Sequence, residues 1–112
     1  MTVIKGEGGG LLFRKNDSTS FGYRFFVGQK NSDLNYDTKH IAGDFVGFKV
    51  KLSNLYLLTA IARGNSISLY VDKQWLTTVE DQTSSSGAIG IMAWDNDSPA
   101  EVVYNDAKVW AL

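Results

Sequence analysis

Apolar and polar residues alternate with a period of two along much of this chain. Ile67, Leu69 and Val71 occupy every second position, separated by Ser68 and Tyr70. This period is typical of a strand with one buried face. Turn residues flank the strand, Arg-Gly-Asn at 63–65 and Asp-Lys-Gln at 72–74, and glycine and asparagine accept positive φ at low cost. The pattern predicts an antiparallel meander of short strands across residues 55–94.

The two other strongly apolar runs of the meander have different character. Residues 55–63 are almost continuously apolar and end at Gly64-Asn65, which predicts a central strand buried on both faces, with a short buried helix as the alternative. Residues 87–94 predict another apolar strand, whose glycines leave room for a neighbouring side chain or a ligand.

The remaining chain is expected to add strands that pack against the meander. Phe21, Tyr23, Phe25 and Val27 share one face of an alternating run, which we assign to the core. The glycine-rich residues 6–10 precede a strand rather than a helix, so a bulge or twisted strand entry is favoured over a phosphate loop. The other expected strands are residues 2–5, 11–14, 34–36, 45–51 and 101–110, with a loop at 38–44.

No amphipathic helix is expected anywhere in the sequence. About nine or ten short strands with regular turns predict an all-β fold, a two-sheet antiparallel β-sandwich. The 112 residues are enough for one hydrophobic core, so we expect residues 1–112 to form a single domain.

Charge and composition exclude several classes of function. The net charge is −1 and no basic stripe is visible, so a nucleic-acid partner is not expected. No apolar run approaches the roughly 20 residues of a membrane helix, so membrane insertion is not expected. Cysteine is absent, which removes disulfides and thiolate metal sites. Residues 1–5 have the pattern of a strand rather than of a signal peptide.

Catalytic constellations are also not evident, and we do not expect an enzyme. Glu80 and Asp81 are adjacent, so on a strand they would face opposite sides, and Glu101 has no second carboxylate on its strand. A pair assembled across strands remains the alternative. His40 is the only histidine, and in a polar loop it is expected to be solvated.

Three motifs in order resemble laminin G-like and concanavalin A-like domains. They are Gly-Gly-Leu-Leu-Phe-Arg at 9–14, the hairpin Ala-Ile-Ala-Arg-Gly-Asn-Ser-Ile-Ser-Leu-Tyr-Val-Asp at 60–72, and the closing strands at 87–91 and 102–110. The nearest likeness is to jelly-roll domains of large bacterial surface proteins. Such domains have more strands before the equivalent of residues 2–5, so the resemblance implies a truncated sandwich. Its exposed sheet edges would pair with another copy, giving a homo-oligomer.

The resemblance implies a non-catalytic module at the cell surface or outside the cell that binds carbohydrate. Exposed aromatic rings and planar polar groups suit sugars, and the candidates are Trp75, Trp94, Tyr23, Tyr36 and Arg24. For Trp94 and Tyr23 a place in the core is favoured over ligand contact, because aromatics contribute most buried area. Trp75 follows a turn and Trp110 lies near the terminus, so both are expected to be exposed.

Two alternatives to glycan binding stay open at this point: a structural self-association domain without a small ligand, and a fragment of a sugar-processing hydrolase. No cofactor is expected except calcium. Asp95 and Asp97, with Asn96 and Ser98, offer the hard oxygen ligands that calcium takes, and laminin G-like domains often carry calcium at a loop edge. The alternative interpretation of this loop is an ordinary turn before Pro99.

Overall fold

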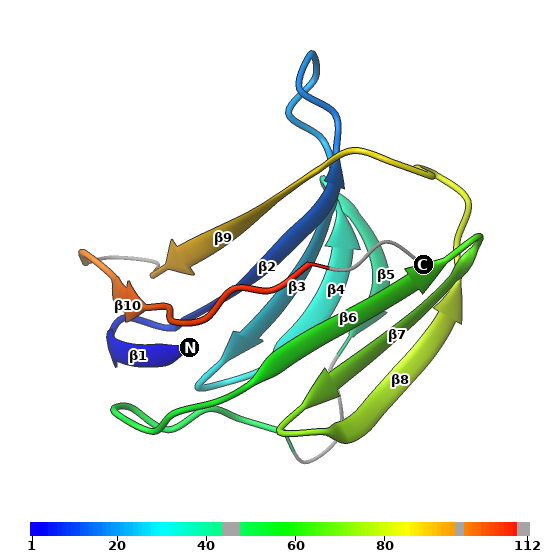
Figure 1. Ribbon diagram of the computed structural model, residues 1–112. Helices are drawn as coiled ribbons and strands as arrows, with labels where there is room; N and C mark the ends of the chain where they lie inside the picture. The colour runs from blue at the N-terminus through cyan, green and yellow to red at the C-terminus, as the bar shows by residue number, and fades with distance from the viewer. Residues whose placement is uncertain (44–47, 96–97, 110–112) are drawn as a thin grey trace.

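The computed structural model describes residues 1–43, 48–95 and 98–109, and these residues form strands and turns with no helix (Figure 1). Ten strands are present in this part of the chain. They are β1 (Thr2–Lys5), β2 (Gly8–Lys15), β3 (Tyr23–Gly28), β4 (Ser32–Tyr36), β5 (Lys39–Gly43), β6 (Leu58–Arg63), β7 (Ser66–Val71), β8 (Gln74–Glu80), β9 (Ala88–Trp94) and β10 (Glu101–Val103). In the described residues there is accordingly no helix that could span a bilayer.

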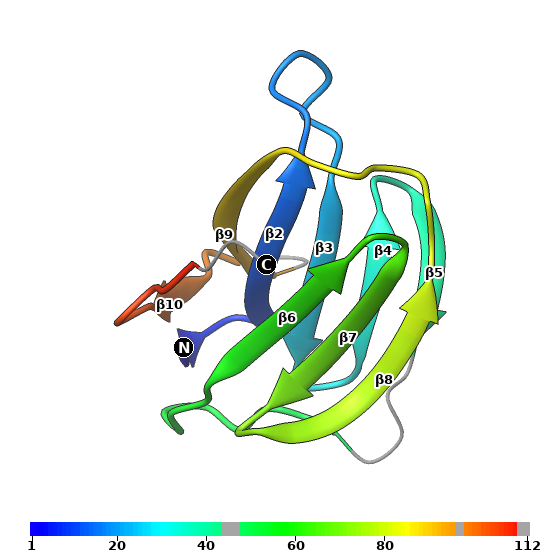
Figure 2. The same cartoon turned by 45° about the vertical axis from the view of Figure 1, so that its right-hand side comes forward.

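The strands form an antiparallel β-sandwich, which confirms the predicted fold class. One sheet has the order β5-β4-β3-β2-β9 and the other the order β6-β7-β8. Figure 2 shows the three-stranded sheet lying in front of the larger one. Strands β1 and β10 form a separate two-stranded pair at the end of the sandwich. Every strand pair is antiparallel, as short turns between consecutive strands favour.

The core lies between the two main sheets and is built from alternate residues of each strand. Tyr23, Phe25 and Val27 of β3 are 0% exposed, and Ile67 and Leu69 of β7 are likewise fully buried. Full burial of a side chain of this size contributes about 1.5–3 kcal/mol through the hydrophobic effect. The period-two pattern therefore identified the inward faces of these two strands correctly.

Two tight turns hold the three-stranded sheet together, as the turn residues predict. Gly64 has a φ of 58° at the first position of the β6–β7 turn, the requirement of a type II′ hairpin. Asp72 and Lys73 have φ values of 51° and 67° in the β7–β8 turn, and two consecutive positive values are typical of type I′. Both turns match the right-handed twist of their strands.

Two expectations about the meander were wrong. Residues 88–94 do not continue it: the chain crosses to the other sheet, where β9 pairs with β2. Residues 55–63 do not form a central strand either. Strand β6 begins at Leu58 and pairs only with β7, while Leu55 and Leu57 are 70% and 50% exposed. An apolar run specifies a strand but not the layer or the neighbours that cover it.

Three further segments differ from expectation because tertiary pairing decided their structure. The loop predicted at 38–44 contains β5, which pairs with β4. The strand predicted at 45–51 is absent at 48–51, although Val50 is buried in the core, and residues 44–47 lie outside the described part. The long final strand stops at Val103, and Trp110 is not among the described residues.

Two details of the β2–β3 hairpin also differ. Phe21 is 43% exposed and precedes β3, so its assignment to the core was wrong. The glycines at 8–10 are inside β2 rather than before it, and their pairing with β3 is regular. The irregularity of β2 falls later, between Leu12 and Lys15 on the side that pairs with β9.

Candidate functional site

The structure divides the predicted ligand-binding residues among three places. Tyr23 and Tyr36 are a registered pair on the inner face of the five-stranded sheet. Arg24 and Trp94 lie on the outer face of that sheet, by strand alternation from their buried neighbours. Trp75 lies on the outer face of the three-stranded sheet. One contiguous site can therefore hold Arg24 with Trp94, but not all five residues.

Tyr23 is a core residue, so its assignment as a ligand contact was wrong. It is 0% exposed, and its ring stacks on Phe13 with centroids 5.3 Å apart and an interplanar angle of 20°. Tyr36 meets the same ring edge-on at 5.1 Å and is partly buried against the core. The alternative interpretation of Tyr23 as part of the core is confirmed. The aromatic area of both residues serves packing between the sheets.

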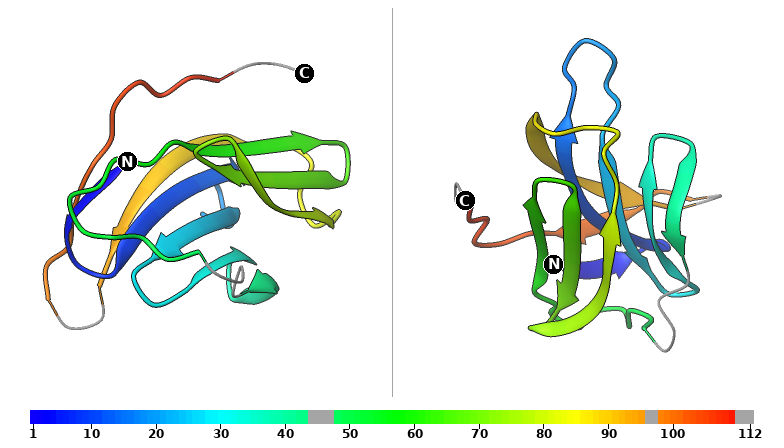
Figure 3. Two further views of the ribbon diagram at one scale, coloured as in Figure 1. Left: turned by 90° about the horizontal axis from the view of Figure 1, so that it is seen from below. Right: turned by 90° about the vertical axis from the view of Figure 1, so that its right-hand side faces the viewer.

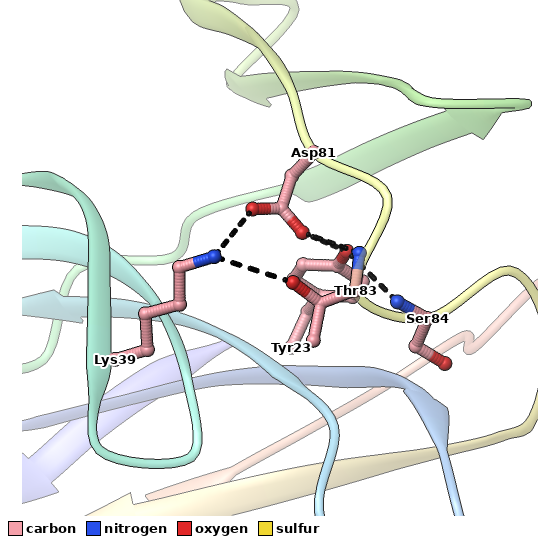
Figure 4. Close-up of polar contacts among 5 residues, drawn as sticks. All are labelled: Tyr23, Lys39, Asp81, Thr83 and Ser84. Carbon is pink, nitrogen blue, oxygen red and sulfur yellow. Dashed lines mark hydrogen bonds and ion pairs between the residues drawn. The ribbon is translucent and has the colours of Figure 1, made fainter.

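The polar tip of Tyr23 belongs to a network at the edge of the sandwich (Figure 4). Its hydroxyl donates to Asp81 Oδ1 at 2.5 Å, and the Thr83 N–H donates to the same oxygen at 2.9 Å. Lys39 Nζ lies 3.4 Å from Asp81 Oδ2. Burial alone would raise the pKa of Asp81, but these hydrogen bonds and the Lys39 charge lower it to about 2.

Asp81 is thus an ionised acceptor inside a structural clamp, with 9% of its side chain exposed. Glu80 is exposed and, opposite Ser66, faces the outer side of its sheet. The two adjacent carboxylates therefore lie on different sides of the strand, as their spacing predicts. They do not form the facing pair that glycoside hydrolysis needs.

The outer face of the five-stranded sheet brings aromatic and planar polar side chains together. Strand register places the following side chains on this outer face: Leu12, Arg24, Phe26, Asp33, Asn35, His40, Met92 and Trp94. Strand register sets their arrangement, because residues paired across strands point to the same side. Arg24 is opposite Asn35, which is opposite His40, and Phe26 is opposite Asp33.

Phe26 and Trp94 form a ring pair in the apolar half of the outer face, which Leu12 and Met92 share. Their ring centroids are 5.8 Å apart at an interplanar angle of 88°, an edge-to-face contact. Trp94 is 47% exposed, so the favoured place in the core was wrong for this residue. The Phe26 ring lies over Gly28, where a Cβ would come within 2.7 Å of Phe26 Cε1. The missing side chain at Gly28 therefore leaves the space that the Phe26 ring occupies.

Asp33, Asn35 and His40 form the polar half, as a chain of hydrogen bonds. Asn35 Nδ2 donates to Asp33 Oδ1 at 3.2 Å, and His40 Nδ1 lies 2.9 Å from Asn35 Oδ1. If the amide nitrogen donates to Asp33, its oxygen must accept from His40, which places the proton of a neutral ring on Nδ1. Burial raises the pKa of Asp33, and the His40 charge and the Asn35 hydrogen bond offset part of this rise.

Arg24 completes the polar half with a guanidinium group that has no partner among the described residues. Its side chain is exposed and makes no hydrogen bond or ion pair with any described residue. Trp94 Nε1 also has no hydrogen-bond partner within the described ranges. The outer face therefore presents two donors, a partly buried carboxylate and the exposed ring of Trp94 beside the partly buried ring of Phe26. Sequence reasoning missed Phe26, Asp33 and Asn35; the pairing of 24 and 26 with 35 and 33 across a hairpin was the signal that could have found them.

The predicted calcium loop is only partly described. Asp97 lies outside the described residues, and Asp95 Oδ2 accepts a hydrogen bond from the Ser98 N–H at 2.8 Å. This contact is typical of an Asx-type turn. Calcium binding by Asp95 and Asp97 stays a prediction. It would be supported by a rise in melting temperature with calcium that Asp95→Asn removes.

Comparison with known proteins gives one informative similarity. No family model matches the sequence, and no curated protein matches it. The solved structure of a carbohydrate-binding module, CBM66 from Bacillus subtilis, is similar with a TM-score of 0.74 and 23% sequence identity. The match covers 84% of this chain and 63% of that chain, so this chain spans less than two thirds of the module's length. At this identity the likeness supports the β-sandwich fold.

Proposed function

We propose that the protein is a non-catalytic module that binds glycan on the outer face of its five-stranded sheet. The observation that carries the proposal is the juxtaposition of the Phe26–Trp94 ring pair with Arg24 and Asp33 on one surface. The fold that this chain shares with a carbohydrate-binding module supports the choice of ligand class. A concanavalin A-like assignment and an extracellular location belong to the same proposal.

Sugar rings present an apolar C–H face and a rim of hydroxyl groups, and the outer face complements both. The exposed ring of Trp94 receives the C–H face, while Phe26 holds that ring edge-on. Arg24 is a diagonal neighbour of Asp33 and forms no ion pair with it. A donor and an acceptor so placed, roughly 7–8 Å apart at their strand positions, can hold neighbouring hydroxyls of one sugar.

The site binds without turnover in this proposal. Asp33 is the carboxylate of the polar half, and the Glu7 carboxylate near Phe26 accepts the Lys30 N–H at 2.6 Å, so the proposal assigns neither to the facing pair that glycoside hydrolysis needs. The Asp33–Asn35–His40 chain instead fixes the orientation of the groups that meet the ligand. A prearranged polar surface lowers the entropy lost when the ligand binds.

Isothermal titration of the protein against a panel of neutral and acidic oligosaccharides tests this function. We expect binding that Trp94→Ala or Arg24→Ala weakens by tenfold or more, about 1.4 kcal/mol. Phe21→Ala is a matched control, because Phe21 is an aromatic residue of similar exposure, 43% against 47%, in a loop outside the face. Binding unaffected by both site variants, or no binding to any sugar, would contradict the proposal.

Self-association is a second candidate function, favoured by a separate observation. Ile89 and Ile91 point to the inner side of the sheet, the same side as Leu11 of the neighbouring strand β2. Each is nevertheless 55% exposed. Strand β9 lies beyond the edge of the three-stranded sheet, which does not cover it (Figure 3). Among the described residues, both β9 and β6 are edge strands with one unpaired side in their sheets. A second copy could cover these apolar residues by strand addition.

A further inference from the structure

Trp75 is the most exposed of the described tryptophans, and a β-bulge explains why. It is 61% exposed at the start of β8. Leu69 pairs with Thr77 but Tyr70 pairs with Trp75, so Leu76 is an extra residue in β8. Without this bulge, Tyr70 would face Leu76, and Trp75 would point to the core side. The bulge instead turns Leu76 toward the core and Trp75 toward solvent.

The exposed ring is held in place by a pair of hydroxyl groups. Trp75 Nε1 donates to Thr78 Oγ1 at 2.8 Å, and Thr78 Oγ1 lies 2.8 Å from Ser68 Oγ. Thr78 Oγ1 accepts the indole proton, and one of the two hydroxyl groups, of Ser68 or of Thr78, donates its own proton to the other. In either arrangement one O–H remains free to donate beside the ring. The surface therefore combines a fixed aromatic plane with a hydroxyl donor at its edge.

The strand face around the ring is neutral, which limits the ligands that it suits. Strand register places a set of neutral residues on this side of the sheet: Thr59, Ile61, Ser68, Tyr70, Trp75 and Thr78. Charged side chains lie at the two ends of this face: Arg63 and Glu80 flank Ser66, and Asp72 and Lys73 form the β7–β8 turn next to Trp75. Each end carries one positive and one negative residue, so a polyanion or polycation would find no patch of a single opposite charge. A neutral chain of sugar rings satisfies both the aromatic plane and the hydroxyl donor.

We propose that the surface around Trp75, with Ser68, Tyr70 and Thr78, is a second binding site, and that its ligand is a neutral, hydroxyl-rich polysaccharide. The two main sheets pack face to face, so this site and the outer face of the five-stranded sheet are on opposite sides of the molecule. One molecule could then contact two chains. The second site uses none of the residues of the proposed function, so either proposal can be wrong without affecting the other.

Affinity electrophoresis in native gels tests the second site. The full chain carrying Arg24→Ala and Trp94→Ala is run in gels containing hydroxyethylcellulose, xyloglucan, soluble starch or inulin, with polygalacturonate as the anionic comparison. We expect at least one neutral polymer to retard this variant, and Trp75→Ala to reduce the retardation at least fivefold. Trp75→Phe should keep part of it, since an aromatic plane remains. Thr78→Val should weaken it although the tryptophan is intact, because the ring loses its fixed orientation.

The outcomes separate the two sites. If Arg24→Ala with Trp94→Ala abolishes all retardation, the second site is wrong and the proposed function stands. If Trp75→Ala alone abolishes it, the second site stands and the outer face is not a glycan site. Retardation by polygalacturonate only, no retardation by any polymer, or a Trp75→Ala effect explained by loss of a dimer in light scattering overturns the second site. Melting temperatures establish that each variant is folded.

Discussion

The Tyr23 hydroxyl donates to the Asp81 carboxylate at 2.5 Å and so joins two segments that are 58 residues apart in sequence. Tyr23 belongs to β3 of the larger sheet, and Asp81 follows β8 of the smaller one. Lys39 of β5 approaches the same carboxylate, and the Ser84 N–H donates to the Tyr23 oxygen at 3.3 Å. The pair is therefore a polar clamp between the two sheets at the edge of the core (Figure 4).

Tyr23→Phe should destabilise the protein by about 1.5–3 kcal/mol, the usual contribution of a hydrogen bond to a charged group. The ring stays, so packing against Phe13 is kept and only the hydroxyl is lost. Urea denaturation of both proteins measures the difference. Lys39→Ala is the comparison: the lysine side chain is 61% exposed, so we expect a loss below about 1 kcal/mol. A larger loss for Lys39→Ala than for Tyr23→Phe would contradict the clamp.

Asp81 should also make the protein sensitive to acid. The pKa of Asp81 is about 2 in the folded protein and 3.8 for an ordinary aspartate. A lowered pKa adds stability above pH 4, and this contribution is lost as the pH falls from 4 to 2. The shift corresponds to about 2 kcal/mol. The stability difference between the wild type and Asp81→Asn should therefore shrink toward pH 2, and a difference that is constant from pH 7 to 2 would exclude this linkage.

Tyr104→Phe should weaken the attachment of β9 to β2. The Tyr104 hydroxyl accepts from the Gly10 N–H at 2.8 Å, and its proton faces the carbonyls of Gly10 and Met92. Because Gly10 and Met92 are a registered pair, the phenol bridges the two strands. We expect a loss of about 1–3 kcal/mol. Hydrogen exchange, measured residue by residue, should rise first in β9; an unchanged rate there would contradict this role.

Burial raises the pKa of Tyr104 above its ordinary value of 10.0, although the hydrogen bonds with Gly10 and Met92 lower it in part. A raised pKa adds stability below pH 10 that is lost as the pH rises through the folded value. Wild type should therefore lose more stability than Tyr104→Phe between pH 9 and pH 11. Thermal melts of both proteins across this range measure the difference, and parallel curves would argue against burial of the phenol.

Ile91→Lys tests self-association through the uncovered side of β9. Wild type should show a mass that rises with concentration in light scattering, and Ile91→Lys should remain monomeric because a charge cannot be buried in a strand-addition interface. The fold should tolerate the change, since Ile91 is 55% exposed. Val103→Lys is the control, as Val103 is 43% exposed on a different strand pair. A monomeric wild type at millimolar concentration would exclude this candidate function.

Some features of the two binding surfaces could be predicted from the sequence, and others required the pairing of strands in the tertiary structure. The sequence correctly predicted that Trp75 is exposed, because it follows the Asp72–Lys73 turn. It could not show the bulge at Leu76 that turns the ring outward, since a bulge exists only relative to the partner strand. Likewise, Arg24 was identified from its type, but its neighbours Asp33 and Asn35 became visible only with the β3–β4 register.

The sequence by itself determined the all-β class, the buried faces of β3 and β7, and the two hairpins of the three-stranded sheet. Each of these follows from interactions between residues close together in the chain: alternation over a few residues and turn chemistry at adjacent positions. Only the tertiary structure decided that β9 joins β2, that β6 is an edge, and that Trp94 is exposed. Those outcomes depend on which distant strand lies alongside, and a period of two is the same in every sheet.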